Sequence, residues 1–450
     1  MTVNATGRQP IKDPSAWIDA LAEDSARALV ALGELLVGVA DRPPKSENAE
    51  RFTTRCLEVE NYSCIIDEDR DLNGVTRVTA ALALAELIAE HSDVVEIGPG
   101  EYSHAPAWTQ TTIGDNVYHH PRHLRAAFPA GTLIDGTRCV VRIDTRDGGV
   151  HSPEVVAYVA RDRQTDARTV LDQLLKRANE LNPYRGRTVR ASFNHSLQLS
   201  VIELPATLTR DTVIVNEGVW HEIDLGISAV RDRHALLNAH GLGARRGVLL
   251  AGPPGTGKSA VSAVIANELV GAFTVIYVEA RAGTELLTAV VEEAQRLGGP
   301  VLMILEDVDL WCRDRRRGDH GGLSELLQAM DINPDARILV IASTNDASTL
   351  DAAAIRTGRF DSIVEVGYPD RTDAARILTA LLAGLPGGPT VDTAAVVRRL
   401  PERTSGSDLR EIIRRAVLGA GEAAELSTAA LMAEVGSGRY RAALPDSAYI

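Results

Sequence analysis

A short glycine-rich segment restricts the folds open to this chain more than any other feature. Residues 252–259 read GPPGTGKS, directly after an apolar run at 248–250 and directly before a helical pattern over 258–269. A strand, a glycine-rich turn and a helix in this order form a P-loop, whose backbone N–H groups converge on phosphate oxygens. A glycine-rich turn without a ligand is the alternative, and the strand-to-helix context argues against it. The predicted phosphate-binding residues are Gly252, Pro253, Pro254, Gly255, Thr256, Gly257, Lys258, Ser259 and Ala260, with Lys258 directed at the β- and γ-phosphates.

Two adjacent acids follow a second apolar run. Residues 301–305 read VLMIL, and Glu306 and Asp307 come next. An apolar strand that ends in acids is the expected neighbour of a P-loop strand. Glu306 is therefore predicted to hold Mg²⁺ together with the Ser259 hydroxyl, and Asp307 to polarise the water that attacks the γ-phosphate. A solvated strand end is the alternative, and the upstream P-loop favours the catalytic interpretation.

Further polar residues follow a third apolar run, at 338–342. Asn345 comes three residues after this run and is predicted to align the attacking water with the second acid. Beyond it, Arg356 and Arg359 are three residues apart in a short turn. These arginines either form a structural ion pair or supply an arginine finger to the nucleotide of a neighbouring subunit.

The second half of the chain alternates short apolar runs with helical patterns. This alternation predicts an α/β fold with a parallel sheet that is covered by helices on both faces. Beyond residue 370 only helical patterns remain. The predicted organisation is an α+β region at 1–216, an α/β domain at 217–369 and a helical subdomain at 370–450. Strand patterns at 188–191 and 197–204 fall within the first of these regions.

Together and in this order, the motifs RRGVLLAGPPGTGKS, STNDASTLDAAAIRTGRFD and SGSDL resemble the AAA family of P-loop ATPases over about 219–432. The resemblance implies a P-loop NTPase sheet with a C-terminal helical lid, ATP and Mg²⁺ as cofactors, and a homo-oligomeric ring, typically a hexamer. It also implies that Asn345 is the sensor residue and that Arg356 and Arg359 act in trans. Gly406 and Ser407 would face the nucleotide from the lid, and residues 222–225 would contact adenine.

Three departures from the family pattern bear on mechanism. The acids read Glu306-Asp307 where most of the family has Asp then Glu, an order similar to that of the mitochondrial AAA protein that assembles respiratory complex III. Residues 279–284 lack the aromatic pore loop with which unfoldase relatives grip polypeptide. The lid has Gly406-Ser407 where many relatives have an arginine. The reversed acids leave open whether the chain turns ATP over rapidly.

Composition limits the possible partners. The net charge is −14, which disfavours a chain-wide surface for nucleic acid or anionic membranes. The four cysteines form no CxxC pair, and no run of eighteen apolar residues indicates a membrane span. We therefore expect reduced thiols and a cytoplasmic location.

The first 216 residues carry two weak signals for small ligands. The segment DVVEIGPGEY at 93–102, which contains EIGPGE at 96–101, is similar to a methyltransferase motif. It lacks a third glycine, and a short strand and turn is the preferred interpretation. His119, His120 and His123 have no accompanying acid or cysteine pattern, so a solvated loop is expected in place of a metal site.

The sequence as a whole predicts an ATP-hydrolysing AAA protein that forms a ring and remodels a protein client recruited by residues 1–216. A nucleotide-gated assembly switch with little turnover is the first alternative. The second is a nucleic-acid-stimulated motor that would use the basic run at 313–317.

Overall fold

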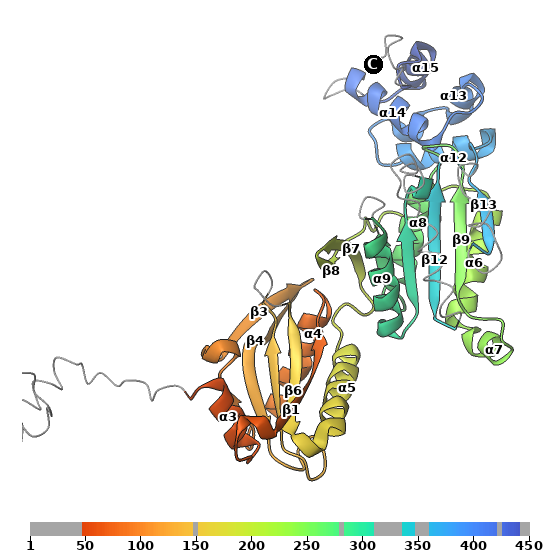
Figure 1. Cartoon of the computed structure of the whole chain (residues 1–450). Helices are drawn as coiled ribbons and strands as arrows, with labels where there is room; N and C mark the ends of the chain where they lie inside the picture. Colours follow the sequence, from red (N-terminus) through yellow and green to blue (C-terminus); the bar gives the residue numbers. More distant parts are fainter. Residues whose placement is uncertain are drawn as a thin grey trace, which may run out of the picture.

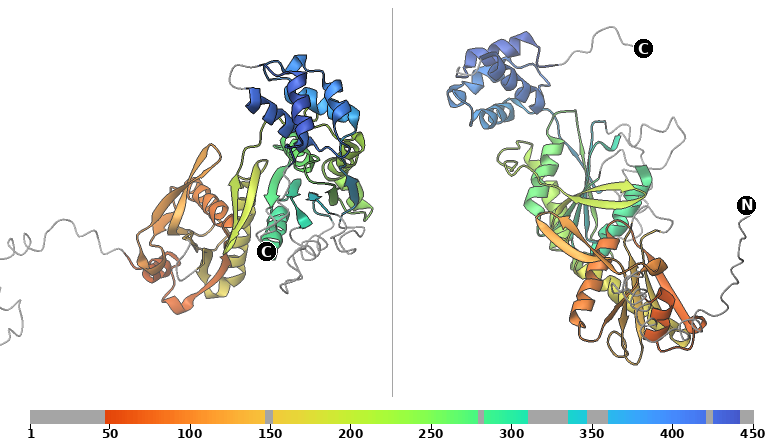
Figure 2. Two further views of the ribbon diagram at one scale, coloured as in Figure 1. Left: turned by 90° about the horizontal axis from the view of Figure 1, so that it is seen from above. Right: turned by 90° about the vertical axis from the view of Figure 1, so that its left-hand side faces the viewer.

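The computed structural model contains two β-sheets and a separate group of helices (Figure 1). It describes residues 47–146, 152–278, 283–309, 335–346, 360–420 and 425–441. Figure 2 shows the N-terminal sheet and the C-terminal helices on different sides of the second sheet. Within the described ranges, no helix combines the length and the apolar character that crossing a bilayer requires.

The N-terminal sheet is antiparallel, with the strand order β1-β6-β5-β4-β2 and with β3 paired to β4. Helices α4 and α5 cover one face, where apolar positions of α5 such as Leu171 and Leu174 pack on the central strands. Helix α3 covers part of the other face, where Phe52 packs on Val140 and Val156. The elements are α3 (Ala49–Cys56), β1 (Ile65–Asp71), α4 (Thr76–Glu90), β2 (Glu96–Gly98), β3 (Ala107–Ile113), β4 (Asn116–Phe128), β5 (Cys139–Asp144), β6 (Glu154–Ala160) and α5 (Gln164–Glu180).

The three histidines of this region lie in strand β4 and not in the solvated loop expected from the sequence. His120 is buried, and its ring nitrogens lie 2.9 Å from Thr111 Oγ1 and 3.0 Å from the Pro121 carbonyl oxygen. The loop expectation was wrong because the long β4 pairs with β3 through this very segment. The EIGPGE segment does form a short strand, β2, followed by a turn.

The second sheet has the strand order β13-β9-β12-β11-β10-β7-β8. Its strands run parallel from β13 to β7, and only β8 is antiparallel to its neighbour. This confirms the predicted α/β fold. The elements are β7 (Thr188–Asn194), β8 (Ser196–Val201), α6 (Glu217–Arg231), α7 (His234–Ala239), β9 (Arg246–Ala251), α8 (Lys258–Leu269), β10 (Thr274–Val278), α9 (Gly283–Leu297), β11 (Val301–Leu305), β12 (Ile338–Thr344) and β13 (Ser362–Glu365).

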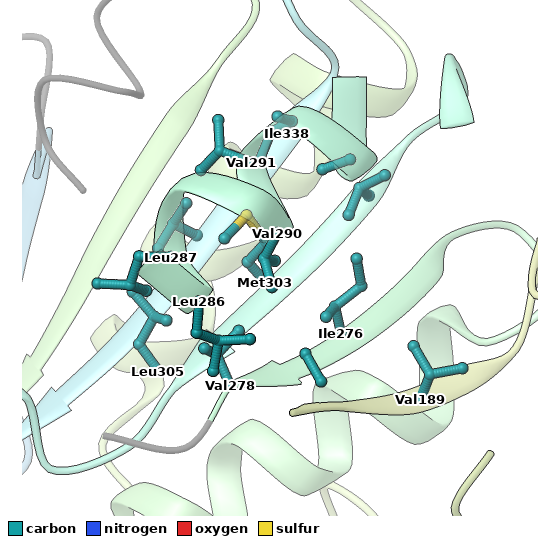
Figure 3. Close-up of a cluster of buried hydrophobic side chains, with 14 of the residues drawn as sticks. Val189, Ile276, Val278, Leu286, Leu287, Val290, Val291, Met303, Leu305 and Ile338 are labelled. Carbon is teal, nitrogen blue, oxygen red and sulfur yellow. The ribbon is translucent and has the colours of Figure 1, made fainter. Parts of the chain in front are cut away.

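Helices cover both faces of the second sheet. Helices α6 and α8 pack on one face, and α9 packs on the other through Leu286, Leu287, Val290 and Val291 (Figure 3). The central strands β11 and β12 are buried along their whole length and are mostly apolar, because helices cover both of their faces.

The β7–β8 hairpin belongs to the second sheet, although the sequence patterns placed these strands with residues 1–216. Strand β7 is hydrogen-bonded in parallel to β10. The N-terminal domain packs against this hairpin, since Val75, Val78 and Ile113 share one apolar cluster with Leu197 and the second sheet. The two sheets therefore meet through a common core and not only through a linker.

The C-terminal helices form a small subdomain with its own core. In Figure 1 it lies beyond the arrowheads of β9 and β12, at the carboxyl ends of the parallel strands. Capping side chains begin three of the helices: Asp370 precedes α12, Asp392 precedes α13 and Ser427 precedes α15. The helices are α12 (Arg371–Leu382), α13 (Thr393–Arg399), α14 (Gly406–Ala420) and α15 (Thr428–Ser437), in agreement with the helical patterns beyond residue 370.

Candidate functional site: a P-loop cavity beneath the helical lid

The glycine-rich loop joins β9 to α8 in a conformation that needs glycine. Gly255 and Gly257 have φ angles of 79° and 106°, which side chains other than glycine rarely adopt. A Cβ atom on Gly255 would lie only 2.0 Å from Ser407 Oγ of the lid, and one on Gly252 would lie 2.2 Å from the Val366 carbonyl oxygen. The loop is therefore confined between the end of β13 and the start of α14, with its backbone exposed to the cavity.

Lys258 begins helix α8 and holds its ammonium group at this loop. Its Nζ donates hydrogen bonds to the carbonyl oxygens of Gly252 at 2.7 Å and Pro253 at 2.9 Å. Burial lowers the pKa of Lys258, and the negative charges of Asp307 and Asp309 act in the opposite direction. A buried cation held against a glycine-rich loop is suited to binding phosphate oxygens.

Asp307 lies directly across from the loop, after the end of β11. Its backbone has a left-handed φ of 52°, and its N–H group donates to Ser343 Oγ at 3.2 Å. Asn345 Nδ2 donates to Asp307 Oδ1 at 3.0 Å. The ends of β11 and β12 thus bring together the carboxylate and the amide that the sequence predicted to act on the attacking water.

Asp309 is an organising residue that the sequence analysis did not single out. It is buried, and its Oδ1 accepts hydrogen bonds from Asn345 N at 3.2 Å and Thr344 Oγ1 at 3.4 Å. These bonds fix the backbone that carries the Asn345 side chain. Its only sequence signal is its position as the third acid of the EDVD run at 306–309.

These groups line one cavity of about 660 Å³, bounded by the P-loop, the lid and the segment before α6. The lid contributes apolar positions of α12, including Ile377 and Leu381, and polar positions of α14. A backbone hydrogen bond of 3.1 Å from Ser407 N to the Gly255 carbonyl oxygen joins the lid to the loop. Of the predicted residues, those that line the cavity are Pro254, Gly255, Thr256, Gly257, Lys258, Ser259, Ala260, Asp307, Asn345, Gly406 and Ser407, and Arg410 joins them from α14.

Three of the predicted residues that the structure describes do not line this cavity. Gly252 and Pro253 contribute to it indirectly, through the carbonyl oxygens that bind Lys258. Glu306 is half-buried beside Asp307 but is not among the lining residues. Arg356 and Arg359 lie outside the described residues, as do the basic run at 313–317 and most of the 279–284 segment.

Residues 222–225, which the family resemblance implied as an adenine contact, do not line this cavity. These residues lie within helix α6, where Glu222 Oε2 accepts a hydrogen bond from Ser362 Oγ at 2.7 Å. The cavity is bounded instead by residues just before α6, namely Thr207, Leu208, Thr212, Val213 and Ile214. No glycine or charge pattern marks this segment in the sequence, so its role appears only from the way the chain folds.

The donor groups of the site suit Mg²⁺ better than a transition metal. Ser259 and Asp307 line the cavity and supply a hydroxyl and a carboxylate, and Glu306 directly precedes Asp307 in the chain. Mg²⁺ prefers oxygen ligands and is commonly held by one or two protein groups together with phosphate and water. Across the described residues there is no group of three or more His, Cys, Asp or Glu that could hold a metal ion.

Comparison with known proteins agrees with this geometry. Residues 248–368 match the family described as "ATPase family associated with various cellular activities (AAA)". The ATP-dependent zinc metalloprotease FtsH 4 of Sphaerobacter thermophilus is 34% identical over 195 residues, which cover 40% of this chain and 29% of that relative. The FtsH of Mycoplasmopsis synoviae is 35% identical over 186 residues, covering 38% and 28% of the two chains. The chain thus spans less than a third of the length of these relatives.

Proposed function

We propose that the whole protein is a cytoplasmic, ring-forming ATPase that remodels a protein client. The premise is that this chain carries an AAA-family P-loop ATPase domain, which uses ATP and Mg²⁺ and catalyses ATP hydrolysis. The observation that carries the proposal is the Asn345–Asp307 hydrogen bond, which lies in the same cavity as the Lys258 ammonium.

Each side chain of the cavity has a distinct part in this proposal. Lys258 binds the β- and γ-phosphates in place of the two loop carbonyls that it contacts here. Asp307 and Asn345 orient water for attack on the γ-phosphorus, and Asp307 accepts its proton. Mg²⁺, held by Ser259 and Glu306, would neutralise charge on the phosphate oxygens.

Steady-state hydrolysis of ATP by the full chain tests the reaction. We expect turnover that requires Mg²⁺ and that is lost in Asp307→Asn while ATP binding remains. Absence of turnover in a wild-type protein that binds ATP and assembles would favour the second candidate, a nucleotide-gated assembly switch. The observation that favours this candidate is that Glu306, the proposed Mg²⁺ carboxylate, is not among the cavity-lining residues.

A mixing experiment tests the ring. We propose that Arg356 and Arg359 reach the nucleotide of the neighbouring subunit, so Arg359→Ala subunits should bind ATP but hydrolyse it about 10³–10⁵-fold more slowly. Mixed with Lys258→Ala subunits, which keep their arginines, they should regain partial activity. Mixed rings that form but stay inactive would contradict an arginine acting in trans.

Recruitment of the client is proposed for residues 1–216. The apolar cluster shared by Val75, Val78 and Leu197 supports this, because it joins the N-terminal sheet directly to the ATPase sheet. Affinity purification with Asp307→Asn, compared with the same variant lacking residues 1–180, tests it. A protein partner retained equally by both forms would contradict recruitment by the N-terminal region.

A further inference from the structure

The segment between β8 and α6 forms one wall of the nucleotide cavity, and we call residues 205–215 the strap. Leu208, Val213 and Ile214 give this wall an apolar surface, and Ile377 and Leu381 of the lid face the same cavity. An apolar slot between two walls, next to a phosphate-binding loop, is suited to a flat aromatic base. The position of the strap therefore determines the shape of the slot.

The strap has no regular secondary structure of its own. Its internal backbone hydrogen bonds are those of a turn, such as Val213 N to the Thr209 carbonyl oxygen at 2.9 Å. It pairs with no strand of either sheet in the described part of the chain. Its position must therefore be set by side-chain contacts with its neighbours. Val213 packs in the apolar cluster of α6 and α8, with Leu208 and Val215 against it.

One arginine adds the charged contacts. The Arg210 guanidinium donates to Asp224 of α6 at 2.7 and 2.9 Å, and to Glu268 of α8 at 2.8 and 2.9 Å. It also stacks over the Trp220 ring, 4.9 Å from the ring centroid. Hydrogen bonds to the two carboxylates raise the pKa of Arg210, so its guanidinium is charged at neutral pH.

A second anchor lies next to Glu268 on the same helix. Asn267 Nδ2 donates to the carbonyl oxygens of Pro205 at 3.0 Å and Leu208 at 3.4 Å. Helix α8 begins at Lys258. The helix that carries the phosphate-binding lysine thus also holds the wall of the base slot.

We propose that Arg210 is a positioning residue for base recognition: it holds the strap against α6 and α8 and so keeps the base slot closed around the adenine of ATP. The proposal rests on the ATPase function proposed above. It concerns affinity for the base alone, because Arg210 does not line the cavity and is not among the phosphate-binding residues.

The test compares a ligand that has a base with one that has none. Binding of ATP and of inorganic tripolyphosphate, both with Mg²⁺, is measured by calorimetry for the wild type, Arg210→Ala and Arg210→Lys. We expect the Kd of ATP to rise about tenfold in Arg210→Ala, and less in Arg210→Lys, because two ion pairs and a cation–π contact of modest strength are lost. The Kd of tripolyphosphate should stay within about twofold. The kcat at saturating ATP should also change little, since the Lys258 and Asp307 contacts remain.

A matched control is Arg231→Ala, which removes another arginine–carboxylate contact of α6, with Asp232, at the far end of the helix. It should leave both affinities unchanged. If Arg210→Ala fails to fold, as judged by circular dichroism, then Asp224→Asn and Glu268→Gln carry the same test, each with a smaller rise in the Kd of ATP.

The proposal is overturned if these variants bind ATP as tightly as the wild type does, or if they lose ATP and tripolyphosphate affinity equally. Failure of the underlying function is distinguishable from both results. In that case the wild type itself would neither hydrolyse ATP nor bind it more tightly than tripolyphosphate.

Discussion

The two sheets of this protein place their buried charged groups in opposite ways. In the N-terminal sheet, Arg125 and Arg142 lie within strands β4 and β5 and are almost fully buried. Arg125 donates to the carbonyl oxygens of Pro99 and Gly100 at 3.0 and 2.6 Å, and Arg142 binds Glu154 at 2.6 Å and also Glu101. These charges are neutralised inside the domain, where they tie the 99–101 turn to the sheet.

The ATPase sheet is apolar along its central strand β11 and places its charged groups beyond the strand ends. Asp307 and Asn345 follow β11 and β12, and Lys258 follows the loop after β9. They face a cavity, which leaves them able to bind a ligand. The comparison suggests that charges within a strand fix a fold, whereas charges after the carboxyl ends of parallel strands serve a ligand. The predictions below test this distinction.

The largest expected effect is that of Lys258→Ala. Loss of the ammonium removes the only positioned cation of the P-loop segment 252–259, so ATP affinity and turnover should both fall. We expect kcat/KM to decrease by about 10⁴-fold or more, measured by coupled-enzyme assay and calorimetry. The matched change in the N-terminal domain is Arg177→Ala, which removes the pairs with Glu86 and Glu90 and should leave hydrolysis within about twofold. Tight ATP binding by Lys258→Ala would contradict the P-loop assignment.

Next in size is the effect of Asp307→Asn. We expect ATP to bind normally and the kcat to fall about 10²–10⁴-fold, because a group that accepts or polarises a proton contributes roughly that much. Glu306→Gln is the paired variant, and should instead raise the Mg²⁺ concentration that half-maximal turnover requires. If Glu306→Gln binds without cleaving while Asp307→Asn keeps turning ATP over, the roles assigned to the two acids are reversed.

The parts of the site that the sequence predicted are those encoded in a single short segment. Residues 252–259 carry the loop glycines and the lysine together, and the acids follow directly on an apolar run. Such local patterns can be recognised without knowledge of the tertiary structure. The parallel sheet could be predicted for the same reason, because the alternation of strand and helix patterns is also local.

What the sequence did not predict depends on long-range contacts. The strap residues Val213 and Ile214 look like any apolar pair and acquire a role only because α8 and the lid are folded beside them. Strands β7 and β8 were recognisable as strands, but strand patterning does not specify which sheet a strand joins. Asp309 was overlooked because its partners, Thr344 and Asn345, lie 35 and 36 residues away.

A third prediction concerns stability in the N-terminal sheet. Arg142→Ala would remove the cation that Glu101 and Glu154 share; both carboxylates are partly exposed, and Arg125 still lies 3.6 Å from Glu101. Breaking a fully buried ion pair costs about 3–5 kcal/mol, so for these partly exposed carboxylates we expect a loss of about 1–3 kcal/mol of unfolding free energy, to be measured by denaturant titration. Hydrolysis by the folded fraction should persist, because these groups face one another and not the nucleotide. If turnover per folded molecule also fell, the buried charges of the N-terminal sheet would affect the ATPase site and not only the fold.

The smallest effect is expected at Glu293, where the two regions meet. Its carboxylate is buried on α9, with Asn182 Nδ2 at 3.4 Å and an Arg296 guanidinium nitrogen at 3.3 Å. Burial raises the pKa of Glu293, so the folded chain holds this proton more tightly than the unfolded chain does. The resulting stabilisation is fully present below the pKa of the unfolded state and is lost as the pH rises through the higher pKa of the folded state.

Glu293→Gln stays neutral at every pH and can still accept from Asn182, so it should melt higher than the wild type at pH 7.5, by about 1–3 °C. The difference should shrink as the pH is lowered, because the wild-type carboxyl then takes up its proton. Glu292→Gln, one residue earlier and largely exposed, is the matched control and should show no such trend. A Glu293→Gln variant that melts lower at pH 7.5 would mean that the ionised carboxylate, paired with Arg296, stabilises the junction after all. Glu293 would then act like Arg125 and Arg142 of the N-terminal sheet, as a buried charge whose pairing stabilises the fold.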